Sequence, residues 1–210
     1  MALEGGEGAG KSTQARLLAE TLRARGLEVV ATREPGGTPG AEAIRALLLH
    51  GYAGDNGEGW LPRAEALLFA AARADHVERL IRPALERGAW VICDRFLDSS
   101  RAYQGGGGGL ADTDILELHR IGSLGLLPDL TILVEVAPEV AASRLAARDV
   151  DGSDRIGGRS TAYHARVAAA FARFAQEAPA RFARIDGNGS AQATHALIQA
   201  ALEPLLVHAA

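Results

Sequence analysis

The amino-acid sequence predicts an α/β fold, in which a doubly wound, five-stranded parallel sheet lies between layers of helices. Short apolar runs of strand length alternate with helical patterns along the chain, and strands joined by crossover helices form parallel sheets. A glycine-rich loop and two further polar loops each follow a predicted strand directly. Ligands bind beyond the carboxyl ends of such strands. We therefore expect these loops to meet at one edge of the sheet.

The apolar spacing places each element in turn. Residues 1–4 form a short apolar run, after which Leu18 and Leu22 have helical spacing in a segment that Gly26 ends. The remaining predicted strands are 27–32, 89–93, 129–136 and 181–186. The remaining predicted helices are 66–88, 138–148, 161–177 and a last helix from about residue 191. Pro83 is expected to bend the longest of them.

Size and composition limit the classes of protein to consider. The chain of 210 residues suffices for one compact domain. Its formal net charge of −4 argues against broad binding to nucleic acid or to an anionic membrane, and no run approaches the roughly 18 apolar residues of a membrane span. Cys93 is the single cysteine, which fits a reducing cytoplasm. We expect one cytoplasmic domain, residues 1–210, with no nucleic-acid or membrane partner.

A phosphate-binding loop follows the first apolar run. The pattern Gly5-x-x-x-x-Gly10-Lys11-Ser12 matches the P-loop, whose glycines let backbone N–H groups face phosphate oxygens. Lys11 can reach the β- and γ-phosphates of a nucleotide, and the Ser12 hydroxyl can bind Mg²⁺. The alternative is a glycine-rich turn before a helix. The predicted nucleotide-binding residues are Gly5, Gly6, Glu7, Gly8, Ala9, Gly10, Lys11, Ser12 and Thr13.

Two charged residues end the buried strand 89–93. Asp94 stands where P-loop proteins place a carboxylate that organises Mg²⁺. Arg95 follows at once, and its forked guanidinium suits a phosphate. The alternative for Arg95 is a surface ion pair. We expect Asp94 and Ser12 to form the metal site.

The P-loop alone indicates a nucleotide but no particular reaction. A GTPase would carry an Asn-Lys-x-Asp motif for guanine, which the sequence lacks. Transport ATPases and helicases need further signature segments and usually longer chains. A small P-loop domain with many scattered arginines suits transfer of a phosphoryl group to a small, charged acceptor.

One predicted helix carries candidate acceptor-binding residues. Glu65, Phe69 and Arg73 follow one another at intervals of four, which places them on one helix face. Phe69 could stack on a base while Arg73 bonds to a base carbonyl. The spacing alone favours another interpretation, with Phe69 in the core and Arg73 in an ion pair with Asp75 or Glu65.

The segment after Arg95 supplies further candidates. Tyr103 and Gln104 precede the glycine run 105–109, in which the backbone could approach a ligand. Gln104 can donate to and accept from a base edge, and Tyr103 could limit the space beside a sugar. The alternative is a loop with one packed tyrosine.

A lid is expected at about residues 148–160. Arg144 and Arg148 are one helical turn apart, and a polar loop with Asp154 and Arg155 follows them. Arginines on such a loop could close over a transferring phosphoryl group. The alternative is a solvated loop.

Taken together, these segments resemble the thymidylate kinase (dTMP kinase) family of P-loop nucleoside monophosphate kinases. The resemblance covers nearly the whole chain. Its motifs occur in the family's order: LEGGEGAGKST, TREPGGT, EALLFAAAR, DRF, AYQGGG, PDLTILVEV and DRI. It implies a three-layer P-loop fold and transfer of the γ-phosphoryl group of ATP to dTMP with Mg²⁺. The product, dTDP, belongs to nucleotide biosynthesis and dTTP supply.

The resemblance also implies roles for individual residues. The expected catalytic residues are Lys11, Arg95, Arg148 and Arg155. The expected acceptor-binding residues are Glu7, Arg45, Phe69, Arg73, Arg95, Ser100, Tyr103 and Gln104. Ala9 stands where some members carry a P-loop arginine, so the bacterial subtype, with its arginines in the lid, is indicated.

The sequence departs from the family pattern at several positions. Gly108 and Gly157 replace an arginine and a lid glutamate, and these changes bear on lid closure and on how firmly the acceptor is held. The resemblance further implies a homodimer. The alternatives are a kinase for another nucleoside monophosphate or a deoxynucleoside, and a nucleotide-binding regulatory protein without turnover.

Overall fold

The structure, a computed structural model, describes residues 1–52, 58–148 and 155–207. Within these residues, five strands form one parallel sheet in the order β2-β3-β1-β4-β5. The strands are β1 (Ala2–Glu4), β2 (Val29–Arg33), β3 (Trp90–Asp94), β4 (Thr131–Glu135) and β5 (Phe182–Asp186). Since every pair is parallel, each connection crosses a face of the sheet. The predicted fold class is therefore confirmed.

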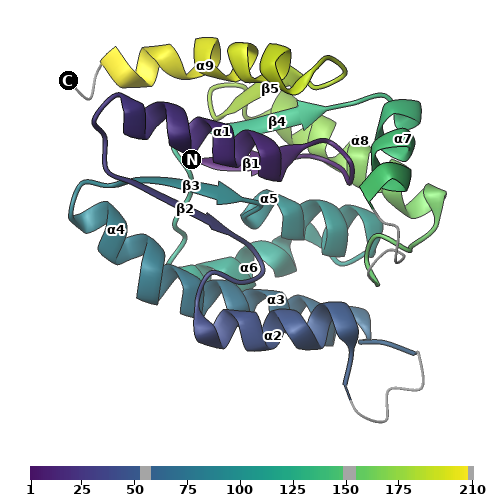
Figure 1. The fold of residues 1–210 in the computed structure, drawn as a ribbon. Coiled ribbons are helices and arrows are strands. Elements are labelled where there is room, and N and C mark those ends of the chain that lie inside the picture. The colour runs from purple at the N-terminus through teal and green to yellow at the C-terminus, as the bar shows by residue number, and fades with distance from the viewer. Residues whose placement is uncertain (53–57, 149–154, 208–210) are drawn as a thin grey trace.

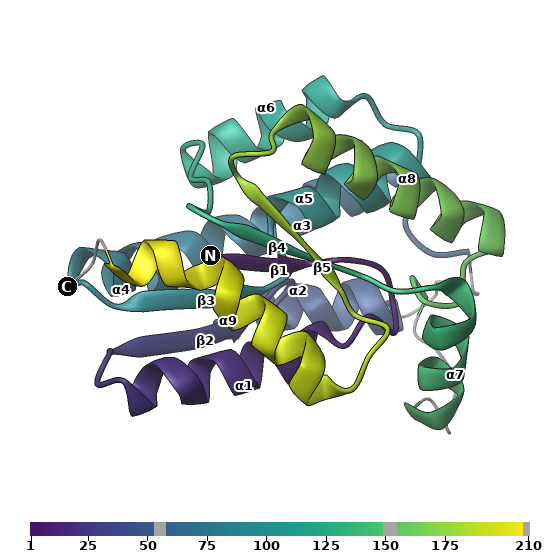
Figure 2. The ribbon, with the colours of Figure 1, turned by 90° about the horizontal axis from the view of Figure 1, so that it is seen from above.

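Helices cover both faces of the sheet (Figures 1 and 2). Helices α1 (Lys11–Ala24) and α9 (Ala191–Val207) pack on one face. The other face carries α3 (Pro62–His76), α4 (Arg82–Glu86), α6 (Asp112–Ser123), α8 (Thr161–Glu177) and the π-helix η2 (Arg101–Gly107). Helix α2 (Pro39–His50) lies beside α3, and α7 (Pro138–Arg148) follows β4. The molecule thus has three layers.

Alternating side chains divide the strands between these two faces. In β3, Ile92 packs with Leu18 of α1, whereas Val91 and Cys93 pack with α3 and α4. In β4, Leu133 faces η2 and α8, opposite to its neighbours. Successive side chains of a strand point to opposite faces, and apolar residues at every position mark a sheet that is buried on both sides.

The three expected loops do meet at the carboxyl edge of the sheet. The backbone N–H of Arg95 donates to the carbonyl of Leu3 (2.9 Å). The N–H of Glu34 donates to the carbonyl of Asp94 (2.9 Å). The ends of β1, β2 and β3 are therefore tied together, and the segments that follow them start from one place.

The helices differ from the prediction in two respects. The predicted helix 66–88 consists of α3, a π-helical turn η1 (Val77–Ile81) and α4. Pro83 lies in the first turn of α4, where a missing N–H costs little, so it begins a new segment after the π-turn. Helices α2 and α6 and the π-helix η2 lie in segments for which no helix was predicted. Among the described residues, no helix is long and apolar enough to cross a membrane.

Candidate active site

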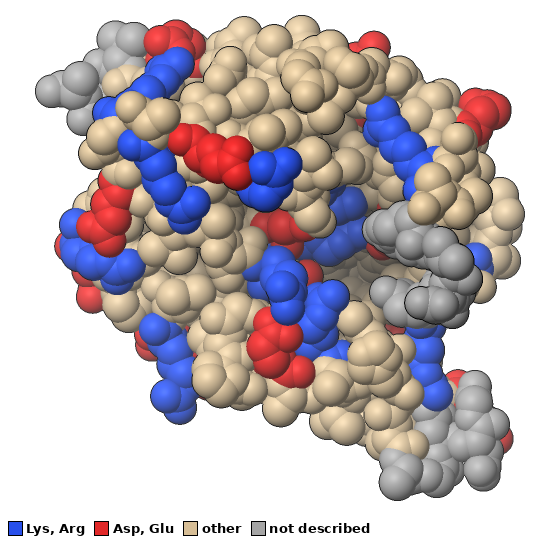
Figure 3. Space-filling model, viewed as in Figure 1, with Lys and Arg blue, Asp and Glu red and all other residues tan. Residues whose placement is uncertain are grey.

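A cavity of about 680 Å³ opens at the carboxyl edge of the sheet. Figure 3 shows basic and acidic side chains gathered around a hollow on the viewed face. Every predicted acceptor-binding residue lines the cavity, together with most of the phosphate loop. Those lining residues are Glu7, Gly8, Gly10, Lys11, Ser12, Thr13, Arg45, Phe69, Arg73, Asp94, Arg95, Ser100, Tyr103 and Gln104.

The phosphate loop is shaped by close approaches to its neighbours. Gly5 has φ +139°, and a Cβ there would lie 2.3 Å from the carbonyl oxygen of Val134 on β4. Gly10 has φ +88° directly before α1, a left-handed conformation that favours glycine. Of the predicted loop residues, Gly5, Gly6 and Ala9 are not in the cavity wall. These three residues shape the part of the loop that lies behind the cavity wall.

Lys11 is buried at the start of α1. Its Nζ donates to the carbonyl of Gly6 (2.6 Å). Burial, and then the positive charge of Arg95, lower the pKa of Lys11 from 10.5 to about 8. A bound polyphosphate would supply the negative charge that this lysine lacks, because opposite charge favours the ionised form.

Ser12 and Asp94 form a site that fits Mg²⁺. The Ser12 hydroxyl donates to Oδ2 of Asp94. The Oδ1 atom of Asp94 is buried and, within the part of the chain that the structure describes, has no hydrogen-bond partner. A hydroxyl and a carboxylate are hard oxygen ligands of the kind that Mg²⁺ takes at P-loop sites. The donor set therefore suits the expected metal.

Arg95 is held in a strained backbone conformation next to this site. Its φ is +69°, which is uncommon for a residue other than glycine. The buried carboxylate of Glu4 fixes the following turn by accepting from the N–H of Phe96 (2.8 Å) and from both the N–H (3.1 Å) and hydroxyl (2.6 Å) of Ser99. These hydrogen bonds hold the strained conformation of Arg95 in place, as expected for a functional position.

The guanidinium of Arg95 is fixed on several sides. It donates to Oε1 of Glu7 (2.5 Å), to the carbonyl of Gly5 (3.2 Å) and to the hydroxyl of Ser99 (3.1 Å). It also lies 4.9 Å from the ring centre of Tyr103. The phenol of Tyr103 donates to the same Glu7 oxygen (3.2 Å), and burial raises the pKa of this phenol. Glu7 of the phosphate loop therefore positions both Arg95 and Tyr103.

Arg73 does not make either of the ion pairs that helical spacing suggested. Its Nε donates to Glu34 (2.7 Å), and its Nη2 donates to the carbonyl of Phe96 (3.0 Å) and the hydroxyl of Ser100 (2.9 Å). The carboxylate of Glu34 belongs to the TREPGGT segment, which is distant in sequence. Among the described residues, Nη1 of Arg73 has no partner, so one edge of the guanidinium remains for a ligand.

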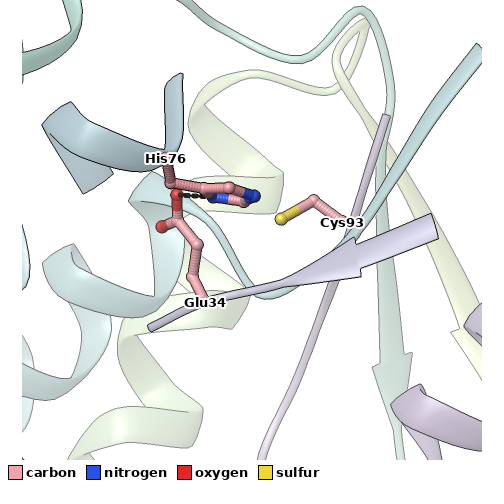
Figure 4. A group of neighbouring side chains, drawn as sticks. All are labelled: Glu34, His76 and Cys93. Atoms are coloured by element: carbon pink, nitrogen blue, oxygen red, sulfur yellow. Dashed lines mark hydrogen bonds and ion pairs between the residues drawn. The ribbon is translucent and has the colours of Figure 1, made fainter. Parts of the chain in front are cut away.

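Glu34, His76 and Cys93 form a buried cluster (Figure 4), and its Glu34 is the carboxylate that pairs with Arg73. His76 Nδ1 lies 3.0 Å from Glu34, and its Nε2 lies 2.7 Å from the hydroxyl of Thr32. The Cys93 thiol donates to the carbonyl of Arg95 (2.9 Å), and burial raises its pKa. Because each possible ligand atom already has a protein partner, the cluster supports Arg73 and is not a metal site.

The glycine run packs against a helix, a role for its small residues that the sequence did not indicate. A Cβ on Gly106 would lie 2.6 Å from that of Ala170, and one on Gly107 would lie 2.6 Å from the ring of Tyr163. Both partners are on α8. At Gly108 a Cβ would lie 2.6 Å from the carbonyl oxygen of Gln104, so this backbone has no room for the arginine that the resemblance implied there.

Only part of the predicted lid can be compared with the structure. Asp154 and residues 149–153 lie outside the described residues, and so does the side chain of Arg148. Arg155 is described but is not in the cavity wall, whereas Arg144 is. Arg144 donates to the carbonyls of Gly187 (2.8 Å) and Gly189 (3.0 Å). Arg144 is therefore held at this edge by two backbone carbonyls, in addition to the cations already described.

Several residues of the cavity wall were not predicted. They are Arg33, Glu34, Pro35, Leu49, Phe96, Ser99, Leu145 and Ile156, whereas Arg144 was already a candidate with the lid. The TREPGGT and DRF motifs contain four of them, so motif membership was the available signal. Leu49 and Leu145 reach the cavity from α2 and α7, whereas Ser99 and Ile156 reach it from the segments after Phe96 and Arg155.

Comparisons with known proteins agree with this site. The family model for thymidylate kinase matches residues 3–198. The chain is 59% identical over 204 residues to thymidylate kinase of Rhizorhabdus wittichii, covering 97% of this chain and 96% of the relative. It is 48% identical over 200 residues to that of Caulobacter vibrioides, covering 94% and 92%. The crystal structure of thymidylate kinase from Ehrlichia chaffeensis superposes with a TM-score of 0.76 at 32% identity, covering 96% of both chains.

Proposed function

The chain belongs to the thymidylate kinase family and phosphorylates dTMP to dTDP, and we propose that the central cavity performs this transfer with the residues assigned below. One observation carries the assignment. Lys11 of the phosphate loop and Arg73 beside the acceptor pocket line the same cavity. A single space therefore has room for a donor and an acceptor that share a reacting phosphoryl group.

We propose that the phosphate loop binds ATP, the phosphoryl donor used by the family. The backbone around Gly8 and Gly10 and the amino end of α1 would face the phosphates. Lys11 would neutralise the β- and γ-phosphates as the γ-phosphorus leaves the bridging oxygen and bonds to an oxygen of dTMP. Positioning and charge provide most of the catalysis in such transfers.

We propose that Ser12 and Asp94 hold Mg²⁺ with the nucleotide. Bound there, the ion would neutralise charge on the transferring phosphates. The free oxygen of Asp94 supports this proposal, since a buried carboxylate oxygen without a partner is costly unless a cation occupies the site.

We propose that the acceptor phosphate lies against Arg95 and Arg45. Both line the cavity, and Arg45 is held by a hydrogen bond to the carbonyl of Pro35 (2.8 Å). Glu7 would face the sugar 3′-hydroxyl while it fixes Arg95. Tyr103 would crowd the 2′ position and favour deoxyribose. Ser100 would act through Arg73, to which it is hydrogen-bonded.

We propose that thymine stacks on Phe69, with its carbonyl bonded to Arg73 and its N3 edge against Gln104. A methyl pocket distinguishes thymine from uracil by only about 1–3 kcal/mol. dUMP is therefore a poor substrate, and dCMP, which mispairs with buried polar groups, is a worse one.

We propose a lid at about residues 148–160 that brings Arg148 and Arg155 toward the transferring group. Arginine contacts of this kind are worth roughly 10³–10⁵ in rate. We also propose a cytoplasmic location, because a single cysteine fits a reducing compartment.

ADP release from Mg·ATP tests the assignment, with dTMP, dUMP, dCMP, dAMP and thymidine as separate acceptors. We expect the fastest turnover with dTMP, slower turnover with dUMP and near background with thymidine, which has no phosphate for Arg95. A preference for another monophosphate would keep the donor site and overturn the roles of Phe69, Arg73 and Gln104.

We propose that the chain acts as a homodimer through α3 and α6. Large apolar side chains are exposed on these helices and the turn that follows: Leu67, Leu116, Ile121, Leu124 and Leu127. Exposed large apolar side chains on neighbouring helices support an interaction site there, and a second copy of the chain offers the same side chains.

A further inference from the structure

We propose that Glu65 and Arg159 are positioning residues that turn the amide oxygen of Gln104 toward the acceptor base and thereby exclude cytosine. The inference rests on the proposed placement of the base against Gln104. It gives a role to two residues that take no other part in the reaction described above.

Gln104 separates two cavities. Its side chain lines the large cavity with Phe69 and Arg73. It also lines a smaller cavity of about 240 Å³, whose wall contains Glu65 and Arg159. Gln104 is 3% exposed, so its amide has a defined partner on one side and the acceptor pocket on the other.

The carboxylate of Glu65 determines which way this amide points. Nε2 of Gln104 donates to Oε1 of Glu65 (2.9 Å). A carboxylate only accepts, so the opposite rotamer would place the Gln104 oxygen against another acceptor. Within the described part of the chain, no donor reaches Oε1 of Gln104. The oxygen therefore remains for a ligand in the large cavity.

Arg159 holds Glu65 in this position. Its guanidinium donates to Oε2 of Glu65 and to the phenol of Tyr163 (2.7 Å). The phenol of Tyr163 in turn donates to the carbonyl of Tyr103 (2.8 Å), the residue before Gln104. The pair thus fixes the side chain of Gln104 directly and its backbone through Tyr163.

The resulting pattern matches only one class of pyrimidine edge. Gln104 presents an acceptor, and Nη1 of Arg73 presents a donor. Thymine and uracil offer an N3–H donor next to a C4 carbonyl acceptor. Cytosine offers the reverse, with an acceptor at N3 and an amino donor at C4. Arginine has no acceptor, so the orientation of Gln104 decides whether cytosine meets one mismatched group or two.

The variant Glu65→Gln tests the proposal, because it keeps the shape of residue 65 and gives it both a donor and an acceptor. The Gln104 amide can then turn either way. We expect the ratio of kcat/KM for dTMP over dCMP to fall about tenfold or more, the size of one buried mismatch. The dTMP over dUMP ratio serves as an internal control and stays unchanged, since both bases carry N3–H.

Three further variants make the result decisive. Arg159→Met should also lower the dTMP over dCMP ratio, and Arg159→Lys should retain it. The matched control is Glu117→Gln, which removes an exposed carboxylate that pairs with Arg120 on α6 and should leave every ratio unchanged.

The outcomes separate this inference from the proposed function. If Gln104→Leu changes the ratio but Glu65→Gln stays within twofold of the parent, the orienting role is wrong and the base placement stands. If Gln104→Leu also leaves the ratio unchanged, the base does not lie against Gln104, and both proposals fail. Direct dTMP binding by calorimetry provides a readout for any variant that turns over slowly.

Discussion

At the scale of single residues, the site depends on groups that are costly to bury. Glu4, Lys11, Glu34 and Arg73 are each less than a tenth exposed. Burial of a charge is tolerated only where partners compensate for it. Glu34 and Arg73 compensate each other, whereas Lys11 has only backbone and distant carboxylates. Burial accordingly lowers the pKa of Lys11.

Glu4 gives the fold a pH dependence. Burial, and then the negative charge of Asp98, raise the pKa of Glu4 from 4.5 to about 7. The native state therefore binds a proton that the unfolded chain has released, and the free energy of unfolding falls as the pH rises from 4.5 to 7. The full difference is about 3 kcal/mol. We expect urea unfolding of Glu4→Gln to lack this fall.

The isosteric Gln keeps the acceptor for Phe96 and Ser99, so the variant tests charge alone. Arg120 lowers the pKa of Glu117, so Glu117→Gln alters stability only on the acidic side and should keep the parental fall toward pH 7. A parental profile in Glu4→Gln as well would contradict the assignment.

Lys11 can be observed by itself because it is the only lysine in the chain. Burial, and then the charge of Arg95, lower its pKa to about 8. We expect the ¹³C-methyl NMR signal of the reductively methylated lysine to titrate near pH 8 in the free protein. Addition of Mg·ATP should move this titration upward, because the phosphates favour the charged form. A midpoint near 10.5 without ligand would show that the site is more solvated than its burial indicates.

At the scale of elements, the π-helix η2 connects the proposed base pocket to α8. It carries Tyr103 and Gln104 on one side and packs Gly106 and Gly107 against α8 on the other. A π-helix widens the turn and is found most often at functional sites. Glycine at the contact lets the two backbones approach. The glycine run thus fixes the position of Tyr103 and Gln104 by packing against α8.

Gly107→Ala tests this packing. The new Cβ would lie 2.6 Å from the ring of Tyr163, so either the ring or η2 must shift. We expect a loss of about 1–3 kcal/mol in the free energy of unfolding. We also expect the mutation to lower the affinity for dTMP more than the affinity for ATP.

Gly105→Ala is the matched control, since its Cβ would lie 3.6 Å from the carbonyl oxygen of Leu110, an ordinary contact. Denaturant unfolding and calorimetry measure both variants. Equal loss of ATP and dTMP binding in Gly107→Ala would show that η2 does not serve the acceptor site in particular.

At the scale of the whole molecule, the neighbouring helices α3 and α6 both carry exposed apolar side chains. Helices α3 and α6 pack closely, with a Cβ on Gly122 placed 3.3 Å from the carbonyl oxygen of Ala70. Ile121 of α6 is 63% exposed and Leu67 of α3 is 55% exposed. Because α3 also carries Phe69 and Arg73, an interface on this face would stabilise the wall of the acceptor pocket.

Sedimentation velocity tests the dimer. We expect the parent chain to sediment as a dimer and Ile121→Lys as a monomer, because a lysine ammonium is costly to bury at the centre of an apolar interface. Leu197→Lys, at a 47% exposed position on α9, should remain dimeric. A monomeric parent at micromolar concentration would contradict the proposal.

Much of the fold and of the site was predictable from local sequence. The strand and helix alternation, the P-loop pattern and the motifs around Phe69 and Gln104 are each contained in short segments. Helices α2 and α6 were not predicted. In α6, Ile115 and His119 are buried while Ile121 and Leu116 are exposed, so its apolar residues do not form one clear face.

Strand period, glycine spacing and residue type are local properties, so the elements and the chemistry of each loop can be predicted from the amino-acid sequence. The partners of the buried charges depend on the tertiary structure. Arg73 pairs with Glu34 and Glu65 pairs with Arg159, at separations of 39 and 94 residues. Helical spacing favours neighbours four residues apart. Burial overrides that preference here. The fold brings a distant opposite charge to a position that is more buried and more rigidly held than a neighbour on the same helix.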